Sequence, residues 1–407
     1  MVDVVVVGAG ASGLVASIVA ARKGKKVLLL EKNPKVGKKL LATGNGKCNI
    51  TNQRPTLDHF HSQNLPFIQE VFEGYSYQSV KQFFKSIGLE LIEAKEGKVF
   101  PLSLQASAVV NLLEAECEQL GVQIVCDAVV TKVTKKENLF SIHYNNQVIK
   151  TQKLLLATGH CSAPQLGGVL DGIGFARTFS HTIVKSFPTL VQLTSGLSER
   201  HLKAMAGVKV ESRVTLKRGS GEMVTKQGDV LFTNYGISGL AILDISRFVM
   251  VELLTKKNVM LTIDLMPKMS HEQLVALMRK SLVKKSTKPL EVWMQGFINK
   301  KLIRPILEPL KLQNETVGSI SSNIKMVDAI VTQIKNFRFE VNGSRGYKGA
   351  EVATGGVNTK EVDAKTMESK KVKGLYMTGE MLDVDGDRGG FNLHFAWVTA
   401  LRAGESI

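Results

Sequence analysis

The first thirty residues alternate between apolar runs of strand length and an apolar pattern of helical spacing. Val4 to Val7 are all β-branched, as expected for a parallel strand that is buried on both faces. Leu14 to Arg22 has helical character, and Lys25 to Leu30 forms a second apolar run that ends at Glu31. This strand–helix–strand order predicts the opening unit of a Rossmann-like α/β domain.

Three glycines separate the first strand from the helix. Gly8, Gly10 and Gly13 give the pattern G-x-G-x-x-G, which permits a tight turn, close approach of the backbone to a pyrophosphate, and close helix–strand packing. The helix N-terminus offers free N–H groups to that pyrophosphate. Glu31, about twenty residues further on, is suited to accept hydrogen bonds from ribose hydroxyls. An acid at this position argues against a 2′-phosphate and leaves NAD or FAD.

Two later strands favour FAD. KLLLATG at 153–159 ends in Thr-Gly and GLYMTGE at 374–380 ends in Gly-Glu, and both short apolar runs are predicted to return to the first sheet. Gly389 and Gly390 then precede a helical segment at about 392–402. The N-terminus of this helix is suited to the flavin edge that gains negative charge on reduction.

The stretch GKKLLATGNGKCNITN at 37–52 is rich in glycine and small polar residues, so we expect a loop that binds the cofactor. Lys38 and Lys39 can offset phosphate charge there. Cys48 has no partner cysteine nearby, and we expect it to pack beside the flavin rather than to relay electrons.

The middle of the chain changes character near Phe187. Strand-like alternation, with a Gly-Ser-Gly turn at 219–221, gives way to helical spacing and then returns to a strand. We therefore predict an FAD-binding domain at 1–187 and 345–407, interrupted by an inserted substrate-side region at 188–344. Within the insert, 188–266 and 337–344 are expected to be β-rich and 267–336 helical.

The composition is that of an ordinary globular protein, with 44% hydrophobic and 22% charged residues, but the charge is strongly positive. The chain has 53 basic and 36 acidic residues, a net charge of +17. Four cysteines show no CxxC pair and no metal-ligand spacing, so we expect free thiols, no metal and a cytoplasmic location. No run approaches the length of a membrane span, and no membrane partner is expected.

Positive charge is concentrated in the helical part of the insert. Residues 279–312 hold nine basic and two acidic residues. This pattern is compatible with an anionic partner such as RNA or with a solvated helix face. Lysine dominates and no known RNA-binding motif accompanies it, which favours the solvated face and leaves nucleic acid open.

The chain resembles a known family through motifs that span nearly its whole length: GAGASG, LATGNGKCNITN, LLLATG, FTNYGISG, ATGGV, TMESK and TGEMLDVDGDRGGFNL. These are similar to the aminoacetone-oxidase-like (BaiN-type) family of bacterial FAD-binding oxidoreductases. The resemblance implies a glutathione-reductase-like FAD domain with an inserted region. It also implies FAD contacts at Gly8, Gly10, Ser12, Gly13, Glu31, Lys32, Lys39, Thr43, Asn49, Val130, Thr158, Gly159, Gly379, Glu380, Gly390, Asn392 and Leu393.

Three residues are candidates for a catalytic base. His160, His394 and Tyr235 depart from the family pattern near the expected flavin face or substrate side. Each also has a structural interpretation as a polar residue that supports its surroundings.

We expect an FAD-dependent oxidoreductase in which the flavin takes a hydride from a small amine, aminoketone or related carbonyl compound. Electrons would pass to dioxygen or another acceptor. No second dinucleotide motif is present, although a transiently bound NAD(P)H is left open. Two alternatives are a flavoprotein that binds or modifies nucleic acid through the basic insert, and an NAD(P)H-dependent reductase of an unsaturated substrate. The oligomeric state is left open.

Overall fold

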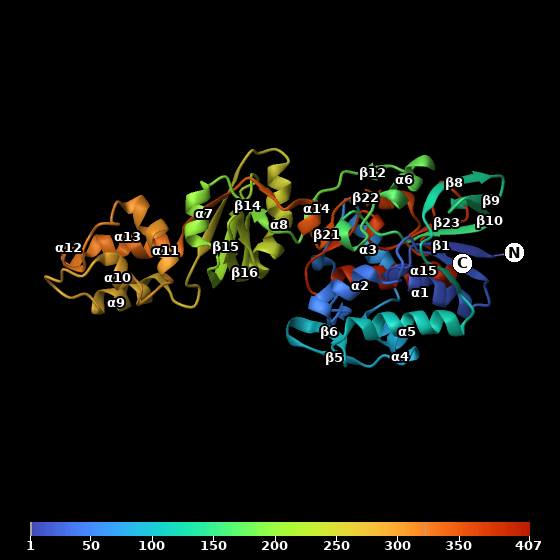
Figure 1. The fold of residues 1–407 in the computed structure, drawn as a ribbon, viewed down its shortest axis with the longest axis horizontal. Coiled ribbons are helices and arrows are strands. Elements are labelled where there is room, and N and C mark those ends of the chain that lie inside the picture. The colour runs from blue at the N-terminus through green and yellow to red at the C-terminus, as the bar shows by residue number, and fades with distance from the viewer. Residues whose placement is uncertain (1, 322) are drawn as a thin grey trace. The chain divides into compact units, whose positions relative to one another are not determined.

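The computed structural model describes residues 2–321 and 323–407 and divides the chain into two units (Figure 1). Unit 1 comprises the residues up to Phe187 together with Glu351–Ile407, and unit 2 comprises Pro188–Ala350. The sequence pattern places the second boundary at 344/345, a few residues earlier. Each unit has its own cluster of buried hydrophobic side chains.

Unit 1 is built on a five-stranded parallel sheet in the order β23-β11-β1-β2-β7. The central strand β1 pairs with β11 on one side and with β2 on the other, and all its residues are buried. This sheet confirms the predicted Rossmann-like α/β fold. The strand bounds are β1 (Val4–Val7), β2 (Val27–Leu30), β7 (Gln123–Val125), β11 (Lys153–Leu156) and β23 (Leu375–Met377).

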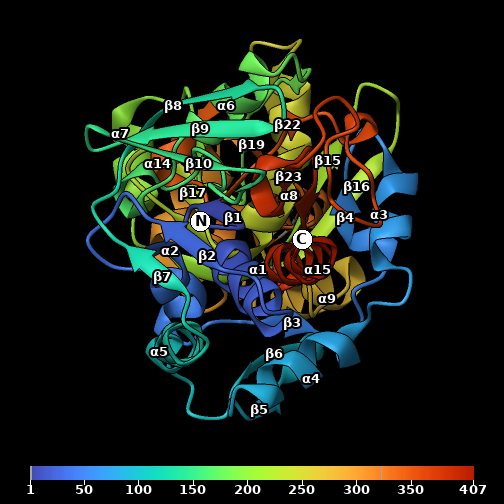
Figure 2. The same ribbon diagram turned by 90° about the vertical axis from the view of Figure 1, so that its right-hand side faces the viewer.

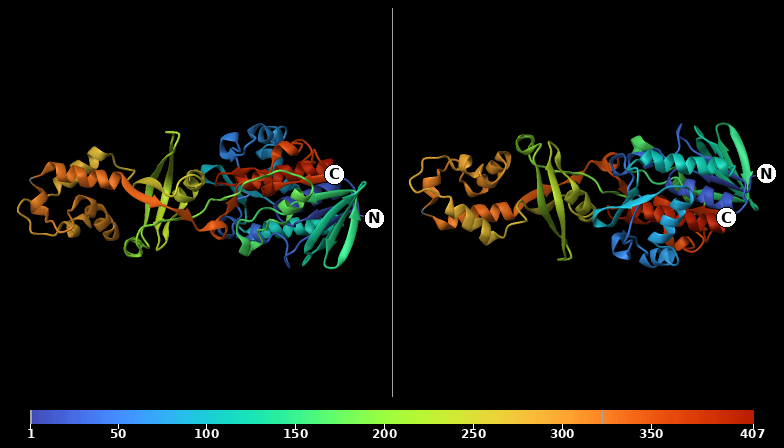
Figure 3. Two further views of the ribbon diagram at one scale, coloured as in Figure 1. Left: turned by 90° about the horizontal axis from the view of Figure 1, so that it is seen from above. Right: turned by 90° about the horizontal axis from the view of Figure 1, so that it is seen from below.

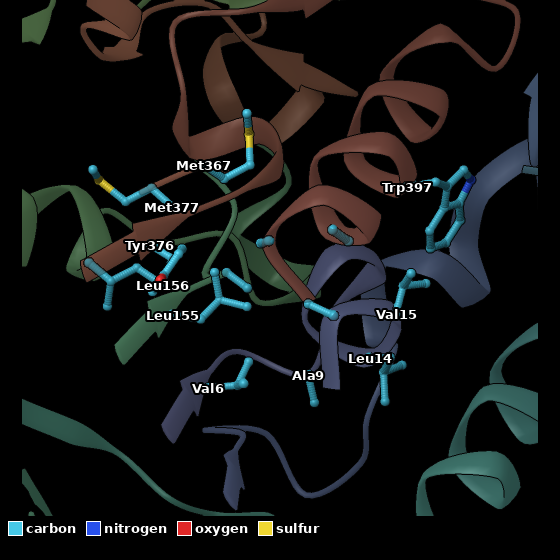
Figure 4. Close-up of a cluster of buried hydrophobic side chains, with 14 of the residues drawn as sticks. Val6, Ala9, Leu14, Val15, Leu155, Leu156, Met367, Tyr376, Met377 and Trp397 are labelled. Atoms are coloured by element: carbon cyan, nitrogen blue, oxygen red, sulfur yellow. The ribbon is translucent and has the colours of Figure 1, made fainter. Parts of the chain in front are cut away.

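Helices α1 (Ala11–Arg22) and α15 (Phe391–Ser406) lie side by side in unit 1 (Figure 2). Figure 4 shows Leu14 and Val15 of α1, Trp397 of α15 and strand residues such as Leu155 in one hydrophobic cluster. The Trp397 indole is fully buried and donates a hydrogen bond to the Ile50 carbonyl at 2.8 Å. The sequence predicts the C-terminal helix at about 392–402. The observed helix α15 ends at Ser406 and is thus longer at its C-terminal end.

Smaller elements complete unit 1. The antiparallel sheet of β8, β9 and β10 lies near the N-terminus (Figure 3), where the Thr151 hydroxyl donates to the Asp3 carbonyl at 3.0 Å. The bounds are β3 (Thr51–Asn52), β4 (Phe60–His61), α3 (Leu65–Phe72), α4 (Tyr77–Ser86), β5 (Leu91–Glu93), β6 (Lys98–Pro101), α5 (Ala106–Gln119), β8 (Val130–Lys136), β9 (Leu139–Tyr144), β10 (Gln147–Thr151), α6 (Asp171–Thr178), β12 (Ile183–Val184), β22 (Gly356–Val357) and β24 (Asp385–Gly386).

The prediction of a continuous loop at 37–52 is wrong in part. Helix α2 (Lys38–Ala42) forms there, followed by a 3₁₀ turn at Thr43–Gly46 and the short strand β3. Lysine, leucine and alanine favour a helix at 38–42, and burial of the Leu40 side chain in the core of unit 1 adds the tertiary packing that a five-residue helix needs.

Unit 2 contains a seven-stranded antiparallel sheet in the order β19-β18-β15-β16-β17-β14-β20. The predicted hairpin is present, with Lys209 opposite Leu231 and Lys217 opposite Met223. The region also holds two helices that its β-rich pattern did not indicate, including the fourteen-residue α8. The bounds are β14 (Leu193–Thr194), α7 (Glu199–Met205), β15 (Lys209–Lys217), β16 (Met223–Phe232), β17 (Gly236–Ser238), α8 (Leu240–Leu253), β18 (Val259–Asp264), β19 (Phe337–Val341) and β20 (Gly343–Ser344).

The helical part of unit 2 follows β18, as the spacing predicts. A single run at 290–310 is divided at residues 295–299 into two helices. The bounds are α9 (His271–Lys280), α10 (Leu290–Met294), α11 (Lys300–Leu307), α12 (Val317–Ser321), α13 (Ile324–Lys335) and α14 (Gly346–Gly349). Across residues 2–321 and 323–407, no helix has both the length and the apolar character needed to cross a membrane.

The contact between α1 and α15 yields a stability prediction. A Cβ at Gly404 would lie 2.6 Å from Val19 Cβ and 2.9 Å from the Ala16 carbonyl oxygen, so Gly404→Ala must push the helices apart. We expect unit 1 to lose about 1–3 kcal/mol in free energy of unfolding, the usual cost of overpacking. Urea unfolding followed by circular dichroism measures the loss.

Gly174→Ala is the matched control, because Gly174 lies in helix α6 with no atom within 4 Å of an added Cβ. This variant should gain about 0.5–1 kcal/mol from helix propensity. Equal stability of the two variants would contradict the proposed close packing.

Candidate functional site

The glycine-rich turn between β1 and α1 brings backbone segments into contact. Gly8 has φ +103°, and a Cβ there would lie 2.6 Å from the Ala157 carbonyl oxygen. A Cβ at Gly13 would lie 1.8 Å from the Gly8 carbonyl oxygen. Gly10 differs, because a Cβ there would meet no protein atom within 4 Å. Gly8 and Gly13 are thus required by protein packing, whereas Gly10 borders open space.

That open space lies at the N-terminus of α1. Gly10 is the N-cap residue, no side chain caps the helix, and the first turn contains no acidic residue. The first-turn amides have no acceptor within the helix, and the macrodipole favours an anion beside them. Ser12 is buried in this turn, and a Cβ at Gly379 would lie 3.0 Å from its hydroxyl oxygen. A glycine with free space beside uncapped amides fits a pyrophosphate.

Glu31 follows β2 at the same edge of the sheet and is 7% exposed. Its Oε2 accepts from the Ala9 amide at 2.8 Å, and Ala9 lies in the glycine turn (Figure 4). Its Oε1 accepts from the Asn33 amide at 2.8 Å and from Asn33 Nδ2 at 2.6 Å. A carboxylate offers about four acceptor positions, so one remains for a ribose hydroxyl. Lys32 is half-buried beside it.

A second carboxylate, Glu380, connects segments that are distant in sequence. Its Oε2 accepts from Lys39 Nζ at 2.8 Å, and its Oε1 accepts from the Ser162 hydroxyl at 2.7 Å and the Ala353 amide at 3.1 Å. Burial alone would raise the pKa of Glu380, but Lys39, together with His160 and Ser162, lowers it below its usual value. Glu380 is therefore ionised at neutral pH and fixed in orientation.

Two threonine hydroxyls at the ends of neighbouring strands lack partners. Thr158 follows β11 and Thr378 follows β23, and in the described part of the chain the Oγ1 atoms of both are buried without a hydrogen bond. Gly159 adopts φ +68°, and a Cβ there would lie 3.9 Å from Glu380 Oε2 as its only near neighbour. Both hydroxyl oxygens are covered by protein atoms, and a Cβ at Gly172 would lie 2.0 Å from Thr158 Oγ1, so the threonines line the strand ends while Gly159 borders open space.

The N-terminus of α15 approaches β3. Gly390 is its N-cap with φ +97°, and a Cβ there would lie 2.5 Å from the Thr51 carbonyl oxygen. The Asn392 side chain donates to the Gly386 carbonyl at 2.7 Å and accepts from the Gly386 amide at 2.8 Å. Asn392 thus uses its amide to shape the preceding loop, and Leu393 packs against the core of unit 1. These contacts leave the helix N-terminus uncapped by any side chain.

Thr43 and Asn49 interact chiefly with protein backbone. The Thr43 hydroxyl donates to the Leu40 carbonyl at 2.6 Å, and Asn49 Oδ1 accepts from the Val99 amide at 3.2 Å. Val130 begins β8 at a bulge and is 8% exposed.

Cys48 is fully buried, and burial raises the pKa of its thiol to about 11. Both properties suit a residue that packs in the core rather than one that relays electrons.

The candidate bases differ in environment. His160 is buried, its Nδ1 accepts from the Cys161 amide at 2.8 Å, and its Nε2 lies 3.0 Å from the Ser186 hydroxyl. Burial lowers the pKa of His160, so the ring is neutral with its proton on Nε2. Tyr235 lies in unit 2, where the Arg345 guanidinium stands 4.7 Å from the centre of its ring.

His394 is completely buried in the first turn of α15. Its Nδ1 lies 2.8 Å from the Thr51 hydroxyl, while Nε2 has no partner among the described residues. Burial lowers the pKa of His394 to about 3, so the imidazole is neutral at physiological pH.

Sequence reasoning missed three contributors to the site. Asn33 orients Glu31, and Ser162 and the Ala353 amide orient Glu380. Asn33 lies two residues after Glu31 and Ser162 three residues after Gly159, and this closeness to motif positions is the only sequence signal that could have indicated them. The Ala353 amide could be found only from the fold.

The uncapped helix, the open glycine and the two oriented carboxylates fit FAD, and comparison with known proteins agrees. Residues 2–406 match the family model described as "HI0933-like protein Rossmann domain". The chain belongs to the HI0933-like family. This membership confirms the resemblance drawn from the motifs and makes the protein an FAD-dependent oxidoreductase.

Relatives in this family match over the full length. The chain is 32% identical over 403 residues to a 3-dehydro-bile acid delta(4,6)-reductase of Clostridium scindens, covering 98% of both chains. It is also 32% identical over 407 residues to a ribosomal RNA dihydrouridine synthase of Haemophilus influenzae, covering 99% and 98% of the two chains. A flavocytochrome c3 fumarate reductase structure has a TM-score of 0.50 at 17% identity, covering 100% of this chain and 78% of that one, and is similar in fold.

Gly10→Ala tests the cofactor site of this HI0933-like protein. Gly10 has φ −85°, which alanine adopts freely, and its Cβ would meet no protein atom. The variant should fold normally but bind FAD roughly tenfold or more weakly, because the methyl group occupies the space for the pyrophosphate. Titration of FAD-free protein by flavin fluorescence measures this. Unchanged affinity in Gly10→Ala, with Gly174→Ala as control, would place the pyrophosphate elsewhere.

His394 gives a pH prediction. Its folded pKa of about 3 lies below the ordinary 6.5, so the unfolded state binds the proton first as pH falls. Stability is complete above about pH 6.5 and declines toward pH 3. Between pH 7 and pH 5 the wild type should lose about 2 kcal/mol more than His394→Gln. Urea unfolding at both values measures the difference.

Gly174→Ala, which changes no titratable group, is the control for this pH effect. The control should follow the wild type. Parallel losses in the wild type and His394→Gln would show that His394 does not carry the effect.

Proposed function

We propose that this protein is an FAD-dependent reductase that saturates a carbon–carbon double bond conjugated to a carbonyl group, and that its substrate is a uridine in ribosomal RNA. Support comes from the names of two full-length relatives, one a delta(4,6)-reductase of a 3-dehydro-bile acid and the other a ribosomal RNA dihydrouridine synthase. Both names describe saturation of an alkene next to a carbonyl.

The reaction balances as a two-electron reduction. FAD, when bound and reduced, would supply the hydride that the carbon β to the carbonyl receives, and the α carbon would take a proton from solvent as the double bond is lost. A reduced nicotinamide nucleotide is the proposed source of the two electrons. The chain's own residues bind and orient the cofactor: the glycine turn and uncapped helix α1 hold phosphate, and Glu31 and Glu380 hold hydroxyl groups.

The distribution of charge is the observation that favours RNA over a small molecule. Unit 2 holds 25 basic and 13 acidic residues, a net charge of +12, in 163 residues. Unit 1 holds 28 basic and 23 acidic residues, a net charge of +5. A small substrate with at most one or two charges does not require such an excess, whereas a polyanion gains affinity from each phosphate that is neutralised.

The second candidate is reduction of a small steroid-like enone, because the Clostridium scindens relative is as similar as the Haemophilus influenzae one. The predicted oxidation of an amine or aminoketone runs in the opposite direction, and neither relative's name supports it. Both the substrate and the cytoplasmic location of this chain stay predictions.

One assay distinguishes the candidates. FAD-loaded protein is incubated with NADH or NADPH and with ribosomal RNA transcribed in vitro, which contains no modified bases, and nucleosides are quantified by mass spectrometry. We expect dihydrouridine to form and its formation to require bound FAD, with FAD-free protein as control. Reduction of a 3-keto-4,6-diene steroid with unchanged RNA would instead support the second candidate. Inactivity on both would contradict the proposed reductase.

A further inference from the structure

The end of α9 and the loop that follows form the most basic short segment of unit 2. Residues 279–288 contain five basic residues and no acidic residue. All five side chains are exposed, and none forms an ion pair with a described residue. We call this segment the lysine loop; its basic residues are Arg279, Lys280, Lys284, Lys285 and Lys288.

The lysine loop is distinguished by five neighbouring cations rather than by the lack of ion pairs alone. Some exposed lysines elsewhere in this unit have acidic partners, as in Lys209 with Asp229 at 2.8 Å and Lys268 with Glu211 at 2.6 Å. Five neighbouring cations without counter-charges repel one another, so the folded loop is stabilised by any polyanion that lies against it. Val283, at the middle of the loop, is 62% exposed and adds an apolar contact point.

An aromatic pair adjoins the lysine loop. Trp293 of α10 donates its indole N–H to the Ser281 carbonyl at 3.4 Å, which places α10 against the start of the loop. Trp293 and Phe297 pack edge to face with ring centres 4.8 Å apart, and both are half-exposed. Aromatic faces beside a cationic track are the elements on which unpaired bases stack in proteins that bind single-stranded nucleic acid.

A hollow of about 670 Å³ continues from this pair. It is lined by the chain from Gln295 to Lys301, including Phe297, and by Gly207 and Val208. Lys300 is exposed at its rim, and Lys301 donates to the Ala206 carbonyl at 2.6 Å. The aromatic pair thus contacts the lysine loop through Trp293 and lines the hollow through Phe297, and we call the three features together the basic–aromatic surface.

We infer that the basic–aromatic surface binds single-stranded ribosomal RNA, with the lysine loop holding phosphates and with Trp293 and Phe297 stacking an unpaired base. The inference rests on the proposed RNA substrate and names the part of the chain that recognises it. Lysine ammonium groups on a loop read no base edges, so this surface supplies affinity and leaves sequence selection to other parts of the protein. The sequence pattern favoured a solvated face because lysine dominates the segment and no known RNA-binding motif accompanies it; the contact of Trp293 with Ser281 adds an aromatic partner to the cationic loop.

Charge reversal tests the lysine loop. The variant Lys280→Glu, Lys284→Glu, Lys285→Glu and Lys288→Glu is compared with the wild type by fluorescence anisotropy, using a labelled single-stranded fragment of ribosomal RNA and FAD-loaded protein. We expect affinity at 0.1 M salt to fall at least tenfold. The slope of log affinity against log salt should fall by roughly 3, since each phosphate contact on a single strand contributes about 0.7.

A matched variant controls for net charge. Lys132→Glu, Lys136→Glu, Lys150→Glu and Lys365→Glu changes the total charge equally, at exposed positions of unit 1. It should keep at least half of the wild-type affinity. Equal losses in the two quadruple variants would overturn the inference, because RNA would then respond only to overall charge.

Phe297→Leu tests the aromatic pair separately. It should weaken RNA binding several-fold without changing the salt slope, since stacking is lost and no charge is removed. Melting temperature and flavin content verify that each variant is folded. If Phe297→Leu binds RNA with the same affinity as the wild type, Phe297 does not stack a base. That result would overturn the inference.

Other outcomes separate this inference from the proposed function. If the wild type forms no dihydrouridine yet binds RNA through the lysine loop, the proposed reductase is wrong and the surface stands. If dihydrouridine forms and the loop variant binds RNA like the wild type, the surface is wrong and the reductase stands. Vesicles of phosphatidylglycerol and phosphatidylcholine complete the test: tighter, loop-dependent binding to vesicles than to RNA would identify a lipid surface and overturn the inference.

Discussion

Close backbone contact at the first turn is the constraint on which unit 1 depends. The Gly8 turn lies against the carbonyl of Ala157, and Gly13 lies against the carbonyl of Gly8, so strand β1, helix α1 and the end of β11 meet without side chains between them. Any Cβ at either position would separate these elements. Because the carboxyl ends of parallel strands share one edge, this contact also brings Glu31, Thr158 and Glu380 to the same side of the sheet.

Two carboxylates at this edge are held differently, and the difference suits different roles. Glu31 is fixed by amide donors alone and keeps an acceptor position free. Glu380 is fixed by a cation, a hydroxyl and an amide, so its charge is neutralised by the protein itself. A neutralised carboxylate can stand near a cofactor whose charge changes on reduction without adding repulsion.

The sequence predicts those parts of the fold whose signals are local. The β-branched run at Val4–Val7, the glycine spacing and the hairpin turn at 219–221 each specify their own conformation, and the structure confirms all three. Helix α8 was missed because its apolar residues are nearly continuous and β-branched residues recur in it, a pattern shared with buried strands. Helix α2 was missed because the glycines and small polar residues around it dominated the pattern at 37–52, although Lys38–Ala42 consists of good helix formers and Leu40 is buried. Because only tertiary structure brings them together, Ser162 and the Ala353 amide could not be assigned to Glu380 before the fold was known.

The separation of the two hydrophobic cores has an evolutionary consequence. Unit 1 and unit 2 each have their own cluster of buried hydrophobic side chains, so substitutions at exposed positions of unit 2 leave the packing beneath the glycine turn of unit 1 unaffected. Mutational drift can therefore exchange one insert surface for another while the cofactor chemistry is inherited intact. A single ancestral flavoprotein can in this way give rise to relatives of similar length whose names refer to targets as unlike as a bile acid and ribosomal RNA.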